Sequence, residues 1–186
     1  MTDNKIRCAW CEKDELYTNY HDQEWGRWIT DERLLFEFLI LEGFQAGLSW
    51  HTILKKREHF RNAFDNFQPK KIVHYTQEKV NSLLNNENII RNKLKIQATI
   101  TNASAFLEIQ KEFGSFANYL STFIAEPIDN CPKTLSEVPS FSPLSDNISK
   151  DLKKRGFKFV GTTIIYSFLQ ATGRINDHIE ECWTRT

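Results

Sequence analysis

The stretch Leu41–Trp50, with the sequence LEGFQAGLSW, combines residue types that could bind a flat ligand and stabilise charge. It follows an apolar run typical of a buried helix, and that run carries one carboxylate, Glu42, to its end. A buried carboxylate needs a partner, and Trp50 supplies a flat ring nearby. Gly43 and Gly47 allow the backbone to bend or to approach a ligand closely. The alternative interpretation is a helix end with a satisfied glutamate and a core tryptophan.

A second group of residues has the chemistry of a metal site. His178 and Cys182 are four residues apart, a spacing that on a helix places both side chains on one face. Thiolate and imidazole suit zinc, which takes four such ligands in structural sites. Cys8 and His21 are the expected remaining ligands, and they would join the two ends of the chain. Cys11 is a rival ligand, and a redox role for its Cys-x-x-Cys pair with Cys8 lacks the expected βαβ surroundings.

A third candidate is the glycine-bounded segment from Gly156 to Gly161, which lies between two predicted helices. Such a hairpin presents outward backbone N–H groups, and the start of the following helix adds a positive dipole. These are the parts of a helix-hairpin-helix phosphate clamp, for which Lys158 and Thr162 are further candidate contacts. The alternative is a plain helix–helix turn. The cluster Lys55-Lys56-Arg57 is interpreted as a solvated face rather than a nucleic-acid contact.

Length and composition restrict the class of protein. The chain has 186 residues, 40% hydrophobic and 26% charged, which predicts a single globular domain over residues 1–186. A net charge of zero argues neither for nor against nucleic acid, because a locally basic face can be hidden in a neutral total. No apolar run approaches the roughly 20 residues that cross a bilayer. Four cysteines without an apolar N-terminal signal indicate a reducing cytoplasm.

Apolar periodicity predicts an all-α fold, because no segment alternates with a period of two. The segment 126–144 contains four of the five prolines and is the predicted connecting loop. The helix-hairpin-helix is expected at about residues 146–172. The expected helices are a turn near Glu15–Tyr20, a helix capped near Asp31 and ending near Ala46, Ile53–Phe64, Pro69–Tyr75, Thr76–Asn85, Asn88–Phe113, Phe116–Ile124, a helix capped by Ser145 and Asp146 that ends near Lys154, and one that ends near Gly173.

Together these segments resemble the 3-methyladenine DNA glycosylase I family over nearly the whole chain. Several separate motifs occur in one order, so coincidence is a poor explanation. The segments that carry the resemblance are Arg7–Trp10, Tyr20–Gly26, Leu41–Gly43 with Gln45–Trp50, Lys55–Glu58, Lys153–Thr163, and Asn176–His178 with Cys182.

The resemblance implies a helix-hairpin-helix glycosylase fold with one structural zinc ion joining the two termini. It also implies an enzyme that hydrolyses the N-glycosidic bond of 3-methyladenine in alkylated double-stranded DNA and releases the free base. The implied zinc ligands are Cys8, His21, His178 and Cys182, with Cys11 as an extra cysteine. The implied catalytic residue is Glu42, in a base pocket with Tyr17, Tyr20, Trp25 and Trp50.

The reaction requires that the base leave the duplex stack, and flipping costs a few kcal/mol. Leu48, next to Gly47, is the candidate for filling the gap that the base leaves. Many helix-hairpin-helix glycosylases carry an aspartate two residues before a histidine after the hairpin, but this chain has Asn176 there, with Asp177 out of register. No lysine is suited to Schiff-base chemistry, since Lys158 better suits a phosphate. We therefore expect hydrolysis without strand cleavage.

Two rival functions remain on the sequence alone. A non-catalytic helix-hairpin-helix protein would bind DNA but would not need Glu42 beside an aromatic cluster. A zinc-dependent hydrolase would need an open coordination position, whereas four protein ligands fill a tetrahedral site. We expect a monomer with no membrane partner. Activity on 3-methylguanine is left open by the sequence.

Overall fold

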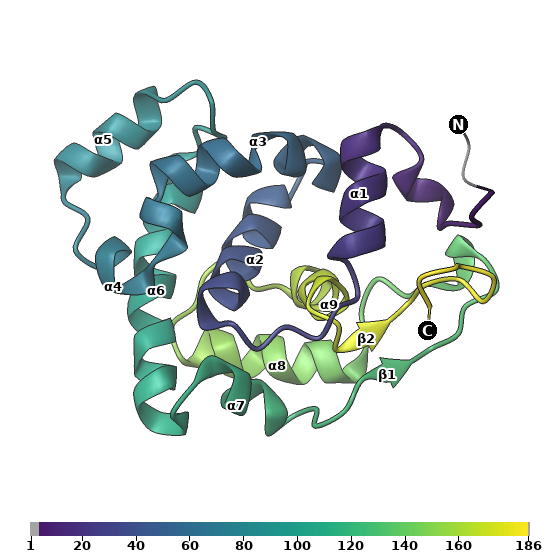
Figure 1. Cartoon of the computed structure of the whole chain (residues 1–186). Helices are drawn as coiled ribbons and strands as arrows, with labels where there is room; N and C mark the ends of the chain where they lie inside the picture. Colours follow the sequence, from purple (N-terminus) through teal and green to yellow (C-terminus); the bar gives the residue numbers. More distant parts are fainter. Residues whose placement is uncertain (1–3, 186) are drawn as a thin grey trace.

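Residues 4–185 are described by the structure, a computed structural model, and this part of the chain is mostly helical (Figure 1). Short 3₁₀ turns lie at Ala9–Cys11, Asp65–Phe67 and Leu135–Glu137. The helices are α1 (Glu15–Gln23), α2 (Glu32–Gln45), α3 (Trp50–Ala63), α4 (Pro69–Ile72), α5 (Gln77–Asn85), α6 (Lys93–Phe113), α7 (Phe116–Ser121), α8 (Pro143–Lys154) and α9 (Thr162–Ala171).

The fold also contains two very short strands, which the sequence did not predict. β1 (Ile128–Asp129) pairs in parallel with β2 (Ile175–Asn176), so the expectation of an all-α chain is wrong in this detail. Strands of two residues are too short to produce a detectable alternation of apolar and polar residues. The pair ties the 126–144 segment to the chain that follows α9.

Helix α2 lies in the middle of the fold and packs against α3, α6, α7 and α9 (Figure 1). The Asp31 side chain caps its first turn by accepting from the Leu34 N–H at 2.8 Å. Ten of its 14 residues are buried. Burial of each large apolar side chain stabilises the fold by about 1.5–3 kcal/mol. The sum over α2 offsets the cost of burying a few polar side chains on the same helix. Two carboxylates, Glu37 and Glu42, are buried in this way.

Two predicted helix starts are displaced by capping side chains. Helix α6 begins at Lys93 rather than Asn88, because the Asn92 side chain accepts from the backbone N–H of Lys95. Helix α8 begins at Pro143 rather than after Ser145. Its N-cap is Ser142, which forms a reciprocal capping box with Ser145.

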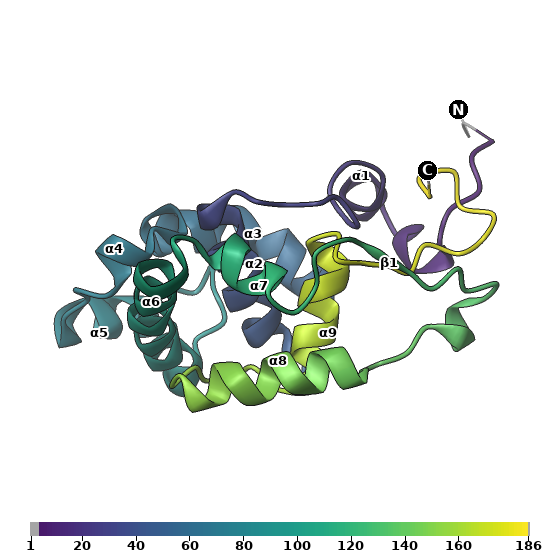
Figure 2. The same cartoon turned by 90° about the horizontal axis from the view of Figure 1, so that it is seen from below.

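The two ends of the described chain lie side by side (Figures 1 and 2). The Trp183 N–H donates to the Ile6 carbonyl at 3.0 Å, close to the start and the end of the sequence. Nearby, Gly173 packs on the backbone of the segment that follows α1. A Cβ atom at Gly173 would lie 2.3 Å from the Arg27 carbonyl carbon, so only glycine fits there. This contact holds the chain after α1 against the end of α9.

The basic cluster of α3 is not the uniformly solvated face that we expected. Arg57 is buried, and it donates to Glu37 of α2 and to Glu24 just after α1. Lys55 is exposed and Lys56 is half-buried. The pattern of charges along α3 could not reveal this, because the partners of Arg57 come from other elements. Arg57 therefore joins three helical segments around the centre of the fold.

Candidate active site

A cavity of about 280 Å³ opens between α1, α2, α3 and α9, and aromatic rings form much of its wall. The structure brings together all of the residues that the sequence placed in a base pocket, and their roles stay predictions. Trp10, from the first 3₁₀ turn, is an additional ring that sequence reasoning did not assign. The aromatic lining residues are Trp10, Tyr17, Tyr20, Trp25 and Trp50.

Glu42 lines this cavity as a buried carboxyl group without a compensating partner. Its side chain is carried by α2, only 4% of the residue is exposed, and Oε2 meets no donor in the described part of the chain. Burial raises the pKa of Glu42 to about 8. The group can therefore donate a hydrogen bond when neutral or compensate a cation when ionised. An unpaired buried acid aimed into a cavity marks a ligand site.

The second unpartnered polar group of the cavity belongs to Trp50, the first residue of α3. Its indole Nε1 is buried without an acceptor among the described residues. The ring is fixed by Phe38, at a centroid distance of 6.3 Å and an interplanar angle of 20°, and by Tyr20 at 5.5 Å. A held ring with a free N–H can both stack on a flat ligand and donate to it.

The two tyrosines of α1 have different supports. Tyr17 stacks on His51 at a centroid distance of 4.9 Å, and the Nε2 atom of His51 lies 2.6 Å from Asp14, the N-cap of α1. Tyr20 packs near Trp50 in the interior. Burial raises the pKa of Tyr17 to about 12 and that of Tyr20 above its usual value. Both phenols therefore stay protonated and can act as donors.

The remaining wall of the cavity comes from elements that sequence reasoning missed. Ser167 and Gln170 face it from α9, Asp177 from the end of β2, and Leu135 and Val138 from the long loop. The helical spacing of Ser167 and Gln170 within the mainly apolar second half of α9 was the available indication. The loop residues gave none, because their approach depends on the pairing of β1 with β2.

A smaller cavity of about 180 Å³ continues from the first, and Glu42 and Ser167 line both. On one side it is bounded by the loop between α2 and α3, where Leu48 is 43% exposed. On the other side it is bounded by Thr163 and Ile164 in the first turn of α9. Leu48 and the start of α9 therefore face each other across a hollow that adjoins the aromatic cavity, and this hollow is called the groove below.

Helices α8 and α9 and the short connection between them lie where the sequence predicted a helix-hairpin-helix, at about residues 146–172, and the role of this pair as such a motif stays a prediction. The amide groups that we expected to meet phosphate are partly committed, because Gly156 N–H donates to the Lys153 carbonyl and Lys158 N–H to Asn102. Gly161 caps α9 without any side-chain hydrogen bond to the helix. The N–H groups of the first turn of α9, near Thr162, therefore lack a side-chain acceptor.

Helix α6 holds both the loop of Leu48 and the α8–α9 turn. Lys95 donates to the carbonyls of Phe44 and Ala46, at 2.8 and 2.7 Å, where α2 ends. About two turns further along the same helix, the Asn102 side chain accepts from the N–H of Lys158 at 2.8 Å and donates to the Lys158 carbonyl at 3.0 Å. These hydrogen bonds pair backbone carbonyl and N–H groups that lie outside regular helix in both segments, and they attach both segments to α6.

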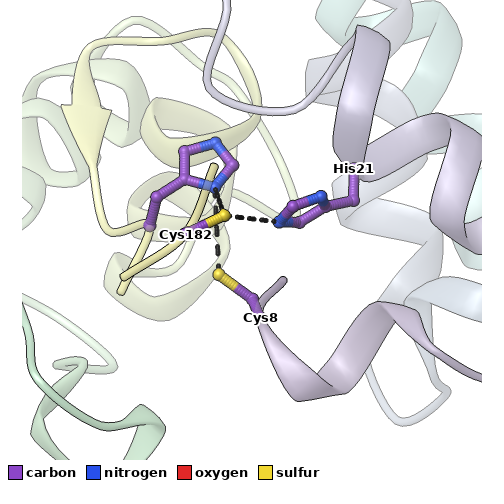
Figure 3. Close-up of side chains that lie close together, drawn as sticks. Cys8, His21 and Cys182 are labelled. Atoms are coloured by element: carbon purple, nitrogen blue, oxygen red, sulfur yellow. Dashed lines mark hydrogen bonds between the residues drawn. The ribbon is translucent and has the colours of Figure 1, made fainter. Parts of the chain in front are cut away.

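A cluster of two thiols and two imidazoles joins the chain ends (Figure 3). The candidate ligand atoms of Cys8, His21, His178 and Cys182 all lie within 4.8 Å of one another, and all four residues are buried. The four-residue spacing of His178 and Cys182, which would place them on one face of a helix, does not come from a helix here. They follow β2 in a turn, in which the Cys182 N–H donates to the Ile179 carbonyl. Cys11 is buried but lies outside this set.

Three sulfur–nitrogen distances within the cluster fit the edges of a tetrahedral zinc site. Zinc bonds of about 2.3 Å to sulfur and 2.0–2.1 Å to nitrogen give sulfur–nitrogen edges of roughly 3.5 Å. The Cys182 Sγ atom lies 3.4 Å from His21 Nε2 and 3.4 Å from His178 Nδ1, and Cys8 Sγ lies 3.8 Å from His178 Nδ1. The other ring nitrogen of His21 lies 2.8 Å from Asp22, a carboxylate that would orient the imidazole.

A family model that describes methyladenine glycosylases matches residues 10–186. The chain belongs to the methyladenine glycosylase family. A curated methyladenine glycosylase, the DNA-3-methyladenine glycosylase 1 of Escherichia coli K12, is 49% identical over 177 residues, 95% of each chain.

Solved methyladenine glycosylases share the fold closely. A crystal structure of 3-methyladenine DNA glycosylase I is 50% identical, with a TM-score of 0.93, over 96% of this chain and 98% of that one. A variant of a 3-methyladenine DNA glycosylase I in complex with 3-methyladenine is 36% identical, with a TM-score of 0.93 over 97% of each chain. The family and the enzyme class expected from the sequence, a DNA glycosylase, are therefore confirmed. No helix of residues 4–185 is both long and apolar enough to span a membrane.

Proposed function

We propose that the chain flips 3-methyladenine out of alkylated double-stranded DNA and hydrolyses its N-glycosidic bond, with Glu42 as the residue that binds and stabilises the cationic base. The observation that carries the proposal is the unpaired, buried Glu42 carboxyl in a cavity walled by aromatic rings. No interaction within the described protein compensates this group, so a ligand of complementary charge accounts for it.

The aromatic walls supply the energy for flipping. Unstacking the base costs a few kcal/mol, and stacking on Tyr20 and Trp50 returns about 1–3 kcal/mol per base. The methylated base is a cation, so the ring faces add roughly 0.5–2 kcal/mol of cation–π attraction. A neutral adenine lacks this attraction and also lacks the charge that would compensate an ionised Glu42. The cavity therefore selects the damaged base by its charge.

The chemical step needs little help from the protein. A positively charged base leaves readily, and Glu42 stabilises positive charge near the reacting bond. The residues that line the cavity include no lysine, which supports hydrolysis without a Schiff base or strand cleavage. Asn176 occupies the position at which many related glycosylases carry an aspartate, in agreement with weak activation of water.

We place the DNA along the groove that leads from the cavity to the start of α9. The pair α8–α9 and its turn would act as a helix-hairpin-helix, with a phosphate at the free N–H groups near Gly161 and Thr162. Lys158 is exposed beside them. The exposed Leu48 lies on the opposite wall and would fill the space left by the flipped base. Contacts of this kind are largely to phosphate and position the duplex.

The metal cluster would hold one structural zinc ion through Cys8, His21, His178 and Cys182. Four protein ligands leave no open position, so the zinc would stabilise the fold rather than activate water. Trp25, which lines the aromatic cavity, packs against His178 at a centroid distance of 4.4 Å. The cluster would therefore support one wall of the cavity.

Three further proposals concern the protein as a whole. The single chain supplies every wall of the cavity, which supports a monomer as the active form. The four cysteines are unpaired, which supports a location in the cytoplasm. The free base is proposed to remain as a product that the cavity binds. The decisive test is release of free bases from methylated duplex DNA, resolved by lesion type. Release of 3-methyladenine is the expected result, and its absence would overturn the proposal.

A further inference from the structure

Asp177 is a carboxylate that is fully buried at the edge of the aromatic cavity, and the mechanism proposed above does not use it. Three donors from two segments hold it. The Asn130 Nδ2 atom donates to Oδ1 at 2.7 Å, while the Tyr166 hydroxyl and the Gln170 Nε2 atom donate to Oδ2 at 2.8 and 2.7 Å. Tyr166 and Gln170 lie one turn apart on α9. The carboxylate is thus built into the fold with its acceptors committed.

This contact fixes the direction in which the amide group of Gln170 points. A carboxylate only accepts hydrogen bonds, so the amide nitrogen of Gln170 must face Asp177. The amide oxygen Oε1 then lies on the other side of the amide group. Gln170 is half-buried and lines the cavity, and no donor in residues 4–185 reaches its Oε1 atom. Since Gln170 lines the cavity and its nitrogen is engaged by Asp177, Oε1 is the atom of this amide that is left to accept from a ligand. It cannot be exchanged for a donor by rotation, because the reversed amide would place two acceptors against each other.

We propose that Gln170, held by Asp177, is a specificity-determining residue that accepts a hydrogen bond from the exocyclic amine of 3-methyladenine and excludes 3-methylguanine. Position 6 carries an amine in adenine, which donates, and a carbonyl in guanine, which accepts. An acceptor facing a carbonyl inside a cavity leaves both groups unpaired, which is a strong basis for rejection. The proposal deepens the proposed function and rests on it.

Glu42 alone cannot provide this discrimination. Because burial raises its pKa to about 8, its carboxyl group can accept from an amine when ionised or donate to a carbonyl when protonated. It therefore tolerates either edge of a purine. The amide of Gln170 has no such freedom while Asp177 holds it. The two residues divide the work, with Glu42 sensing the charge of the base and Gln170 sensing the group at position 6.

The test compares release of 3-methyladenine and 3-methylguanine from the same methylated duplex DNA, expressed as the ratio of the two values of kcat/KM. Gln170→Leu removes the fixed acceptor and is expected to raise the 3-methylguanine to 3-methyladenine ratio about tenfold, mainly by slowing 3-methyladenine release. Asp177→Asn lets the Gln170 amide pair in either orientation, because asparagine can both donate and accept. This variant is expected to move the ratio in the same direction. Gln97→Leu, which changes an exposed glutamine of α6 far from these contacts in the sequence, should keep the ratio of the unmodified chain.

Equal losses for both lesions in Gln170→Leu would indicate a merely structural role and would overturn this inference alone. An unchanged ratio would do the same. Absence of 3-methyladenine release by the unmodified chain would instead overturn the proposed function, and this inference with it. If Asp177→Asn does not fold, Gln170→Leu decides the matter, supported by tryptophan quenching with free 3-methyladenine and free 3-methylguanine. Selective loss of quenching by 3-methyladenine is the expected result.

Discussion

Glu37 and Glu42 are carried into the protein interior by the same helix, but only Glu37 is neutralised there. Arg33, Arg57 and Arg61 all donate to Glu37, whereas Oε2 of Glu42 meets no donor in residues 4–185. Although burial alone would raise the pKa of Glu37, hydrogen bonds from Arg61 and the charge of Arg57 hold it below its usual value. Burial raises the pKa of Glu42, and no cation among residues 4–185 counteracts this effect. Glu37 is part of the scaffold, and Glu42 is left for a ligand.

Glu42→Gln keeps the size of the side chain and removes its charge. We expect release of 3-methyladenine to fall on the order of 10²-fold, the effect of losing one preorganised group that stabilises transition-state charge. Affinity for duplex DNA should stay nearly unchanged, because the phosphate contacts lie elsewhere. Chromatography of released base and fluorescence anisotropy with duplex DNA measure the two quantities. Glu108→Gln, an exposed glutamate of α6, is the matched control. Undiminished excision by Glu42→Gln would contradict the assignment.

The pH dependence of stability should also report on Glu42. Its pKa rises from an ordinary 4.5 to about 8 in the folded chain, so the folded state holds this proton more tightly than the unfolded state. The contribution of Glu42 to the free energy of unfolding should therefore fall as pH rises from 4.5 towards about 8. Glu42→Gln lacks this group, so its stability relative to the unmodified chain should grow across that window. Urea unfolding at a series of pH values checks this, and a constant difference between the two proteins would contradict it.

Removal of the proposed zinc should destabilise the chain ends and the cavity together. We expect one zinc ion per purified chain by elemental analysis, and a lower thermal midpoint in Cys182→Ser or after chelation, because metal binding adds to the folding free energy. Excision should decline in parallel with unfolding. Cys131→Ser is the control, since Cys131 is exposed and outside the cluster. Loss of activity on chelation without any loss of structure would instead favour a catalytic metal.

Leu48→Ala should separate base flipping from base binding. Leu48 lines the smaller cavity rather than the aromatic one, so its loss should slow excision from duplex DNA about tenfold. A tenfold loss corresponds to about 1.4 kcal/mol, a part of the few kcal/mol that unstacking the base costs. Binding of free 3-methyladenine should be unaffected in a fluorescence titration. Leu94→Ala, an exposed leucine of α6, is the matched control. Equal effects on free-base binding and excision would argue against a wedge role.

Most of the helical framework was predictable because its determinants are local. Asp31 caps α2, and Gly114 ends α6 with a φ of +82°, both as the residue types indicate. Errors arose where the apolar periodicity was compatible with more than one first residue of a helix. Helix α6, for example, begins after Asn92 and not at the predicted Asn88. The turn that carries Cys182 was not predicted, because a four-residue spacing between two ligands is compatible with a turn as well as with a helix.

The candidate site was predictable only in part. Glu42 was found because a carboxylate within an apolar run is conspicuous in any sequence. Asp177 was noted in the sequence, but no role was assigned to it. Its role depends on hydrogen bonds from Gln170 of α9 and Asn130 of the loop, which only tertiary packing brings together. Arg57 was misread for the same reason, since its partners come from α2 and from the chain after α1.

The two hydrogen-bonding residues of α6 have a mechanical consequence. Lys95 fixes the end of α2 that precedes Leu48, and Asn102 fixes the backbone of Lys158. The distance between Leu48, the proposed wedge, and the proposed phosphate contact near Lys158 is thus set before any substrate binds. Under the proposed function, the protein behaves as a rigid template, and the distortion falls on the double helix. Lesions in easily bent sequence should then be found faster than the same lesions in stiff tracts.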